Sequence, residues 1–185
     1  MPMIQKIVTG KKRYLPLLLM ADPSEKMIAG YLDKGALYIM KESQRTIAAA
    51  VMFPLGENRY ELKNIAVLPE YRKKGYGTRF LLQLLDEYEK ATDIFVGTGS
   101  TGNPDNEFYQ VGFYRKCGFV YSHTVKNFFI DNYPQPIIEE NGMQCIDMIF
   151  LVRKIRVLLC NETHGRKEEK LSADESRNSS KKAGR

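Results

Sequence analysis

The sequence has no tryptophan, only two histidines and no long apolar run. Its longest apolar segments, 15–21 and 47–53, fall far short of the roughly 18–20 residues that a membrane-spanning helix needs. The N-terminus lacks a basic region followed by an apolar stretch, which argues against a secretory signal peptide. These absences predict a cytoplasmic protein with no membrane partner.

The few cysteines argue against two common scaffolds. Cys117, Cys145 and Cys160 are widely spaced, odd in number and form no CxxC pair. With so few histidines, they are not typical of a zinc site or of a disulfide framework. We expect reduced thiols and no bound metal. A covalent acyl-cysteine on Cys117 is disfavoured, because no histidine base with a clear partner accompanies it.

Apolar residues make up 43% of the 185 residues, which is ordinary for one domain with a packed core. The domain is predicted to span 1–159. Beyond it, residues 160–185 have almost no apolar side chains, so we expect a charged, disordered tail. The net charge is +6, of which 161–185 supply +2 through seven Lys or Arg and five Asp or Glu. So small an excess predicts no nucleic-acid partner, although it suits a polyanionic small molecule.

The order of predicted elements indicates the fold class. Apolar runs and alternation predict the strands Met3–Val8, Ala36–Lys41, Thr46–Phe53, Tyr60–Val67, Asp93–Gly97, Phe119–Ile130 and Gln144–Arg153. Helical spacing predicts the helices Lys12–Ala21, Ser24–Lys34, Gly77–Ala91 and Pro104–Cys117. Antiparallel hairpins come first, and one parallel β-α-β crossover lies in the middle. This order favours an α/β fold with a mixed sheet.

The chemistry is expected where the strand Tyr60–Val67 leads through a basic, glycine-bearing loop into a helix. The first N–H groups of a helix have no internal partner, and the helix dipole adds positive charge, so a phosphate or pyrophosphate fits there. Gly75 and Gly77 would let the backbone approach an anion and adopt dihedrals that other residues avoid. Arg72, Lys73 and Lys74 would add charge at the rim. The alternative is a solvated turn without a ligand.

Two segments carry a resemblance to a known family. The first is VLPEYRKKGYG at 67–77 followed by a long helix, and the second is FYRKCGF at 113–119 at the end of another helix. In this order, with a short strand between them, they resemble the two signatures of the GNAT N-acetyltransferases. The resemblance covers about 3–155. It implies a mostly antiparallel sheet with one central parallel crossover, helices on both faces, and acetyl-CoA as the cosubstrate.

The resemblance also implies roles for individual residues. Backbone groups of Ile65 and Val67 would hold the pantetheine arm, and N–H groups in that stretch would stabilise an oxyanion. Tyr114 would protonate the leaving thiolate; the alternative is a core aromatic residue. The cofactor-binding residues that it implies are Ile65, Ala66, Val67, Arg72, Lys73, Lys74, Gly75, Tyr76, Gly77, Thr78 and, as a weak candidate, Asn106.

Acetyl transfer to an amine requires a group that accepts a proton. A lysine-like amine has a pKa near 10.4, so at pH 7 only about one molecule in a few thousand is neutral. Glu61 is the candidate base, because it lies 14 positions before Gly75. The glutamate base of the histone-acetylating branch has the same separation. The alternative is a surface residue on an exposed strand, where Arg59, Glu61 and Lys63 alternate on one side.

Further segments resemble the bacterial YvbK-like branch of the family, among them VGTGSTGN, Phe128-Phe129 with Tyr133, and GMQCIDM. In that branch we expect histidines where this chain has Lys126 and Asn132, so no role for them carries over. Within VGTGSTGN, residues 97–102 also match GxGxxG. A dinucleotide site is disfavoured, because no β-α-β unit follows. We expect a mobile loop beside the pantetheine channel or the acceptor site.

The predicted function is therefore an N-acetyltransferase in which an amine attacks the thioester directly, without a covalent enzyme intermediate. Two alternatives stay open, a non-catalytic acyl-CoA-binding module and an interaction protein that acts through the tail. The acceptor is a small-molecule or protein amine. Asp131, Glu139 and Glu140 would suit a polyamine, but they form no continuous acidic run. A homodimer also stays open.

Overall fold

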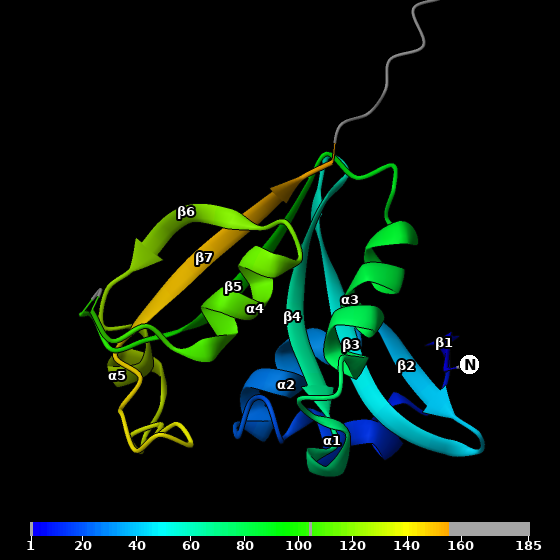
Figure 1. The fold of residues 1–185 in the computed structure, drawn as a ribbon, viewed down its shortest axis with the longest axis horizontal. Helices are drawn as coiled ribbons and strands as arrows, with labels where there is room; N and C mark the ends of the chain where they lie inside the picture. The colour runs from blue at the N-terminus through cyan, green and yellow to red at the C-terminus, as the bar shows by residue number, and fades with distance from the viewer. Residues whose placement is uncertain (1, 104, 156–185) are drawn as a thin grey trace, which may run out of the picture.

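The computed structural model describes residues 2–103 and 105–155. Its strands are β1 (Met3–Ile7), β2 (Ala36–Glu42), β3 (Arg45–Gly56), β4 (Arg59–Val67), β5 (Asp93–Ser100), β6 (Val120–Val125) and β7 (Asp147–Lys154). They form one sheet in the order β1-β2-β3-β4-β5-β7-β6 (Figure 1). Only β4 and β5 are parallel; every other neighbouring pair is antiparallel. The predicted mixed sheet with one parallel crossover is confirmed.

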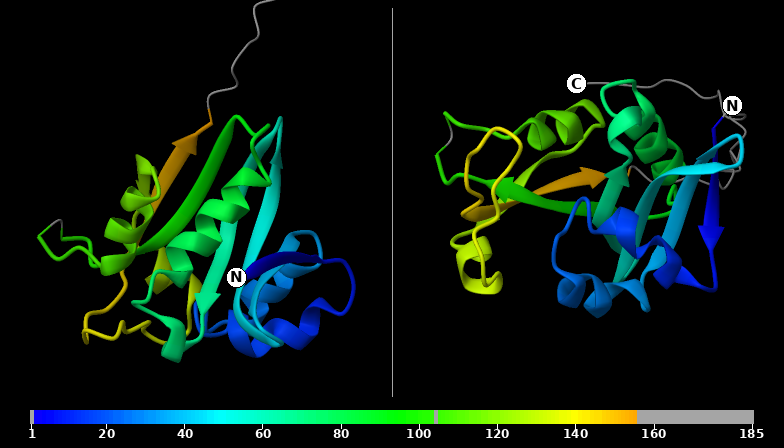
Figure 2. Two further views of the ribbon diagram at one scale, coloured as in Figure 1. Left: turned by 45° about the vertical axis from the view of Figure 1, so that its right-hand side comes forward. Right: turned by 90° about the horizontal axis from the view of Figure 1, so that it is seen from below.

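Helices cover both faces of this sheet, as predicted. They are η1 (Lys11–Tyr14), α1 (Leu15–Leu18), α2 (Glu25–Leu32), η2 (Pro69–Tyr71), α3 (Tyr76–Asp86), α4 (Tyr109–Lys116) and α5 (Phe128–Asn132). In the view from below, α3 and α4 lie on one side of the sheet and α1, α2 and α5 on the other (Figure 2). None of the described helices is long and apolar enough to cross a membrane.

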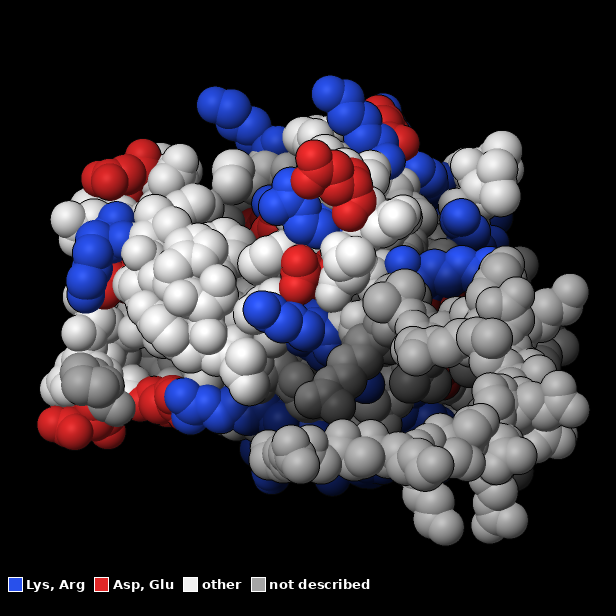
Figure 3. Space-filling view, turned by 90° about the horizontal axis from the view of Figure 1, so that it is seen from above, with Lys and Arg blue, Asp and Glu red and all other residues white. Residues whose placement is uncertain are grey.

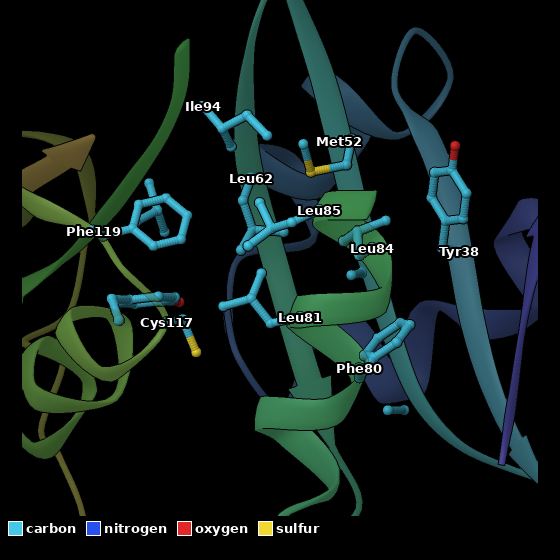
Figure 4. Packing of buried hydrophobic residues seen from close by; sticks show 14 of the residues in the cluster. Tyr38, Met52, Leu62, Phe80, Leu81, Leu84, Leu85, Ile94, Cys117 and Phe119 are labelled. Atoms are coloured by element: carbon cyan, nitrogen blue, oxygen red, sulfur yellow. The ribbon is translucent and has the colours of Figure 1, made fainter. Parts of the chain in front are cut away.

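Each face of the sheet has its own apolar core. On the α3 face, the apolar side chains of Phe80, Leu81, Leu84 and Leu85 are buried against strand residues such as Leu62 (Figure 4). On the other face, α1 and α2 bury the side chains of Leu18, Ile28 and Leu32 against Leu37, Ile39 and Val51. The central strands β2 and β3 are therefore covered on both sides, which explains their nearly continuous apolar sequence.

The sheet divides in two between β4 and β5. Their parallel ladder joins Arg59–Leu62 to Asp93–Val96 and stops there. Beyond it, β4 pairs only with β3, and β5 only with β7, among the strands that the structure describes. The pairing of β3 with β4 shifts at this point, so that Lys63 is an extra, bulged residue. The backbones of the two strands diverge below their junction, and we call this gap in the backbone pairing the opening (Figure 1).

Several predicted elements were too long, and two of the predicted helices show why. The helix predicted over Pro104–Cys117 begins only at Tyr109. Before it, the side-chain carbonyl of Asn103 accepts the Asp105 N–H at 2.9 Å, and the Thr101 hydroxyl donates to the carbonyl oxygens of Asn103 and Asn106. Such local bonds hold a turn and compete with the helix. Similarly, the helix predicted over Lys12–Ala21 is divided into η1 and α1, with Pro16 at the start of α1.

The strand predicted over Phe119–Ile130 ends at Val125, because a buried carboxylate turns the chain there. Asp147 on β7 accepts a bond from Lys126 Nζ at 2.7 Å and one from the Asn127 N–H at 2.9 Å. Asn127 has φ 56°, a left-handed conformation that strands do not adopt, and α5 follows it. The β7 strand, predicted to begin at Gln144, begins at Asp147. This turn directs the chain after β6 toward the open end of the sheet.

Seen from the end where β4 and β5 meet, charges of both signs surround a broad uncharged area toward the β6 end of the sheet (Figure 3). Val120 and Tyr121 of β6 are among the exposed apolar residues of the protein. Cys117 and Cys145 are buried free thiols. No group of three or more His, Cys, Asp or Glu in the described ranges is placed to hold a metal ion. The predicted tail at 160–185, Cys160 included, lies outside the described residues.

Asp147→Asn should destabilise the fold in a pH-dependent way. Burial alone would raise the pKa of Asp147, but the bonds from Lys126 and Asn127 together lower it below its ordinary value. The ionised carboxylate therefore stabilises the fold above the unfolded-state pKa near 3.9, and this contribution is lost as the pH falls through the lower folded-state pKa. We expect the free energy of unfolding in urea to fall by about 1.5–3 kcal/mol at pH 7.

The difference between Asp147→Asn and the native chain should shrink below pH 4. The exposed Asp131 provides the control, since Asp131→Asn should change the free energy of unfolding little at either pH. An equal loss at pH 7 and pH 3.5 for Asp147→Asn would contradict the assigned charge effect.

Candidate active site

One edge of β4 faces the opening in the sheet. The Leu68 N–H donates to the Ile47 carbonyl of β3 at 2.9 Å. Because backbone groups alternate between the two edges of a strand, those of Asn64 and Ala66 also face β3, and those of Ile65 and Val67 face the opening. The Val67 carbonyl there already accepts a bond from Arg72 Nε at 3.0 Å. Of the three predicted backbone contacts, Ile65 and Val67 are thus at the open edge, and Ala66 is turned away.

The start of α3 lies directly beyond this edge. Gly75 is the N-cap residue, no side chain caps the helix, and the first turn contains no acidic residue. The first intrahelical bond runs from the Arg79 N–H to the Gly75 carbonyl at 3.0 Å. The N–H groups of Tyr76, Gly77 and Thr78 therefore have no partner within the helix. Together with the helix dipole, these groups have the chemistry that a pyrophosphate needs, and the binding predicted for this loop stays a prediction.

The two glycines of the loop have different roles. Gly75 has φ 82°, a left-handed conformation that other residues adopt at a cost. Gly77 lies within α3 and has no positive φ. The expectation that it adopts an unusual dihedral is wrong. A Cβ added to Gly77 would lie 3.7 Å from side-chain atoms of Val67 and Phe113, which is ordinary contact. The packing at Gly77 therefore leaves room for a methyl group.

The side chains of the loop are engaged unequally. Arg72 donates to the Val67 carbonyl and pairs with Glu140 at 2.7 Å, so it ties the loop to the segment after α5. The Tyr76 hydroxyl donates to Glu42 on β2. The backbone N–H of Tyr76 is separate from this bond and stays in the anion site. The side chains of Lys73 and Lys74 are exposed. Only these two lysines have the position at the rim that was predicted for all three basic residues.

Tyr114 comes from α4 and is buried in the core of the α3 face, against which Ile65 and Val67 also pack. Its ring lies between those of Phe113 and Phe119, with centroids 5.0 and 5.9 Å away. Burial raises the pKa of the Tyr114 hydroxyl, so it keeps its proton at neutral pH and can only donate it in a hydrogen bond or a transfer.

Asn106, the weakest predicted cofactor residue, is not brought to this place. It is exposed in the turn between β5 and α4, and this turn projects from the sheet away from α3 (Figure 1).

Glu61 lies where β4 and β5 are still paired, next to Phe53 of β3 and Phe95 of β5. It is only 8% exposed, so the alternative of an exposed surface residue is wrong. Its carboxylate pairs with Lys63 Nζ at 2.8 Å. Because Leu62 points into the α3 core, the side chain of Glu61 lies on the opposite face, toward α1 and α2. The predicted base and the pyrophosphate site are therefore on opposite faces of the sheet.

The GxGxxG segment is not a loop. Residues 97–100 continue β5 and pair with Asp147–Phe150 of β7. A Cβ on Gly97 would come within 2.7 Å of the Met148 sulfur, and one on Gly99 within 2.5 Å of the Cys145 sulfur. These glycines make room for side chains of the neighbouring segment. Both the dinucleotide alternative and the expected mobile loop are wrong for this stretch.

Sequence reasoning missed a polar cluster on the α1–α2 face. Asn64, 4% exposed, donates from Nδ2 to the Leu18 carbonyl at 3.0 Å and to the Tyr31 hydroxyl at 3.1 Å. Asp22 accepts a bond from the Tyr133 hydroxyl at 3.2 Å, although 111 residues separate the two. Residues so distant in sequence share no local pattern. The only signal was that each is a polar side chain inside a largely apolar segment.

Known proteins share this architecture. A family model described as an acetyltransferase (GNAT) domain matches residues 33–121. The uncharacterized N-acetyltransferase YvbK of Bacillus subtilis (strain 168) is 34% identical over 135 residues, which cover 73% of this chain and 84% of YvbK. This chain belongs to the GNAT acetyltransferase family. The family resemblance recognised in the sequence is confirmed, and the protein is an acyltransferase.

Solved GNAT structures agree in fold over most of the chain. An acetyltransferase from Elizabethkingia anophelis, crystallised with acetyl-CoA bound, is 35% identical and matches with a TM-score of 0.75, covering 83% of this chain and 97% of that one. A Bacillus subtilis acetyltransferase in complex with CoA is 30% identical, with a TM-score of 0.74 over 83% and 99% of the two chains.

Proposed function

We propose that this GNAT protein transfers an acetyl group from acetyl-CoA to a primary amine by direct attack of the amine on the thioester. The main support for the proposal is that two sets of backbone groups, without strand or helix partners in the described structure, lie next to each other. The open edge of β4 at Ile65 and Val67 leads into the uncapped start of α3. Relatives that are 35% and 30% identical were crystallised with acetyl-CoA and CoA.

The two sets of backbone groups would bind different parts of acetyl-CoA. Bound acetyl-CoA supplies the acetyl thioester. The N–H groups at 76–78 hold the pyrophosphate, helped by the α3 dipole and by Lys73 and Lys74 at the rim. Backbone groups of Ile65 and Val67 align the pantetheine arm like an added strand, and an N–H group of the same edge stabilises the oxyanion. Their side chains take no part in the chemistry.

The amine would approach from the opposite face. Glu61 lies on that face and accepts the proton that the ammonium must lose. Lys63 holds the Glu61 carboxylate in place at 2.8 Å. Tyr114 approaches from the α4 side and donates its proton to the departing thiolate. No side chain of the protein forms a covalent bond with the acetyl group in this scheme.

The cofactor site should depend on the backbone of the phosphate loop (72–77) more than on its charges. Gly75→Val forces a branched residue into a left-handed conformation, which costs about 1–2 kcal/mol and disturbs the N–H groups. We expect CoA affinity, measured by calorimetric titration, to fall about tenfold or more. Lys73→Ala, which removes only an exposed charge, should cost about 1 kcal/mol or less.

Gly77→Ala is the matched control for the phosphate loop, since its methyl group fits beside Val67 and Phe113. It should bind CoA nearly as well as the native chain. If Lys73→Ala abolished CoA binding and Gly75→Val left it intact, the loop would not bind CoA mainly through its backbone N–H groups.

Tyr114→Phe tests whether Tyr114 is the general acid and whether the protein is an enzyme. The turnover number, followed as CoA thiol released from acetyl-CoA with a panel of primary amines, should fall about 10- to 100-fold without vanishing, because a thiolate leaves with little help. The affinity for CoA should not change. Native protein that binds CoA but releases no thiol with any amine would support the alternative of a non-catalytic binding module.

Glu61→Gln should slow the reaction most where free amine is scarce. At pH 7 we expect kcat/KM to fall about 100-fold or more. The deficit should narrow at pH 9.5, because much more of an amine with pKa near 10.4 is then already neutral. Glu57→Gln, which changes an exposed carboxylate beside the same strand, is the control. An equal deficit of Glu61→Gln at both pH values would indicate a structural role.

A further inference from the structure

A carboxylate surrounded by hydroxyl groups lies on the amine side of the sheet. Asp22, between α1 and α2, is partly buried, and one of its oxygens accepts bonds from the Ser24 N–H at 3.0 Å and the Tyr133 hydroxyl at 3.2 Å. The Tyr31 hydroxyl is near enough to this carboxylate to lower its pKa. No Lys or Arg in the described ranges forms an ion pair with Asp22 within 4 Å. Burial raises the pKa of Asp22, because the ionised carboxylate is partly removed from water.

The cluster reaches the open edge of β4. The Tyr31 hydroxyl, which is near the Asp22 carboxylate, accepts a bond from Asn64 Nδ2 at 3.1 Å. Asn64 directly precedes Ile65, the first residue whose backbone faces the opening. The Oδ1 atom of Asn64 is buried and has no hydrogen-bond partner. With the Asp22 carboxylate, it makes a cluster that contains more acceptors than donors. An ammonium group, with three N–H donors and a positive charge, has the chemistry that this cluster lacks.

Other groups around Asp22 limit the rest of the ligand. Tyr133 stacks on Phe129 with centroids 5.4 Å apart and rings inclined by 26°. Because the Tyr133 hydroxyl contacts Asp22, this aromatic pair lies beside the Asp22 carboxylate. Lys63 is near enough to Asp22 to lower its pKa, but its charge is paired with Glu61 at 2.8 Å. Two acidic residues that could have attracted a polyamine are engaged elsewhere, because Glu139 accepts a bond from Gln110 and Glu140 pairs with Arg72.

We propose that Asp22 binds the ammonium group of the acceptor, and that the acceptor is a small primary amine with one positive charge on an apolar, preferably aromatic, body. This inference rests on the proposed function, because it specifies which amine reaches the thioester. Tyr31, Tyr133 and Asn64 orient the carboxylate. Phe129 and Tyr133 contact the body of the amine, and no unpaired carboxylate beside Asp22 is shown, among the residues that the structure describes, that would bind a second cationic group.

The test compares Asp22→Asn with the native protein, with 2-phenylethylamine as the probe. The amide keeps an oxygen that can accept the Ser24 and Tyr133 bonds, so the fold should survive, and thermal unfolding checks this. We expect KM for 2-phenylethylamine to rise about tenfold or more, with kcat at saturating amine and the affinity for CoA unchanged. A merely structural role would instead lower the midpoint of unfolding and change CoA affinity as well.

Matched variants and a second amine sharpen the result. Asp131→Asn, an exposed carboxylate on α5, should leave KM unchanged. Tyr133→Phe removes one donor to Asp22 but keeps the ring beside Phe129, so KM should rise less than in Asp22→Asn. Spermidine should be the poorer acceptor of the native enzyme. An unchanged KM in Asp22→Asn, or a lower KM for spermidine than for 2-phenylethylamine, would overturn the proposal.

Failure of the proposed function remains distinguishable from failure of this inference. Calorimetric titration of 2-phenylethylamine into protein saturated with CoA requires no turnover. If the native chain binds the amine and Asp22→Asn binds it at least tenfold more weakly, Asp22 recognises the ammonium group even in a protein that releases no thiol. Equal binding by the two proteins would refute the proposal whatever the activity.

Discussion

The loss of pairing between β4 and β5 after Leu62 is the constraint on which the candidate site depends. A continuous ladder would satisfy the backbone of both strands and leave no free edge. The bulge at Lys63 shifts the β3–β4 register at the point where the parallel ladder ends. From there, Ile65 and Val67 present backbone groups to an opening and not to a neighbouring strand. The apolar core on the α3 face stabilises the divided sheet, because it joins Leu62 of β4 to Ile94 of β5 and Leu151 of β7.

In the proposed function, the same opening separates the two ligands by face. The start of α3 supplies unpartnered N–H groups on one side, and Glu61, Asp22 and Asn64 lie on the other. Positive potential for an anion and carboxylates for a cation would weaken each other if they were mixed in one pocket. A sheet one layer thick keeps them apart, and the two ligands would meet only through its gap. The segment after α5 contacts both sides, through Tyr133 to Asp22 and through Glu140 to Arg72.

The cofactor side could be predicted from sequence because its determinants are local. A strand, a proline, a glycine with positive φ and an amphipathic helix follow one another within 60–86, and each has a composition that indicates its conformation. Prediction failed where a distant residue decides the local structure. Asp147 ends β6 and starts α5 through bonds to residues about 20 positions away. Met148 and Cys145 explain why 97–100 is a glycine-rich strand and not a loop.

The proposed amine side could not be predicted from the sequence, because all of its residues are distant from one another along the chain. Its cluster joins Asp22, Tyr31, Asn64 and Tyr133 from four separate elements, and the residues around each of them follow ordinary core patterns. An anion site formed by backbone N–H groups needs glycine and a helix start, so it constrains the sequence wherever it occurs. A side-chain pocket needs only that suitable groups meet in space, and many combinations of positions achieve that. A shared fold can therefore keep one cofactor loop while its acceptor pocket changes, and the acceptor has to be inferred from contacts across the structure.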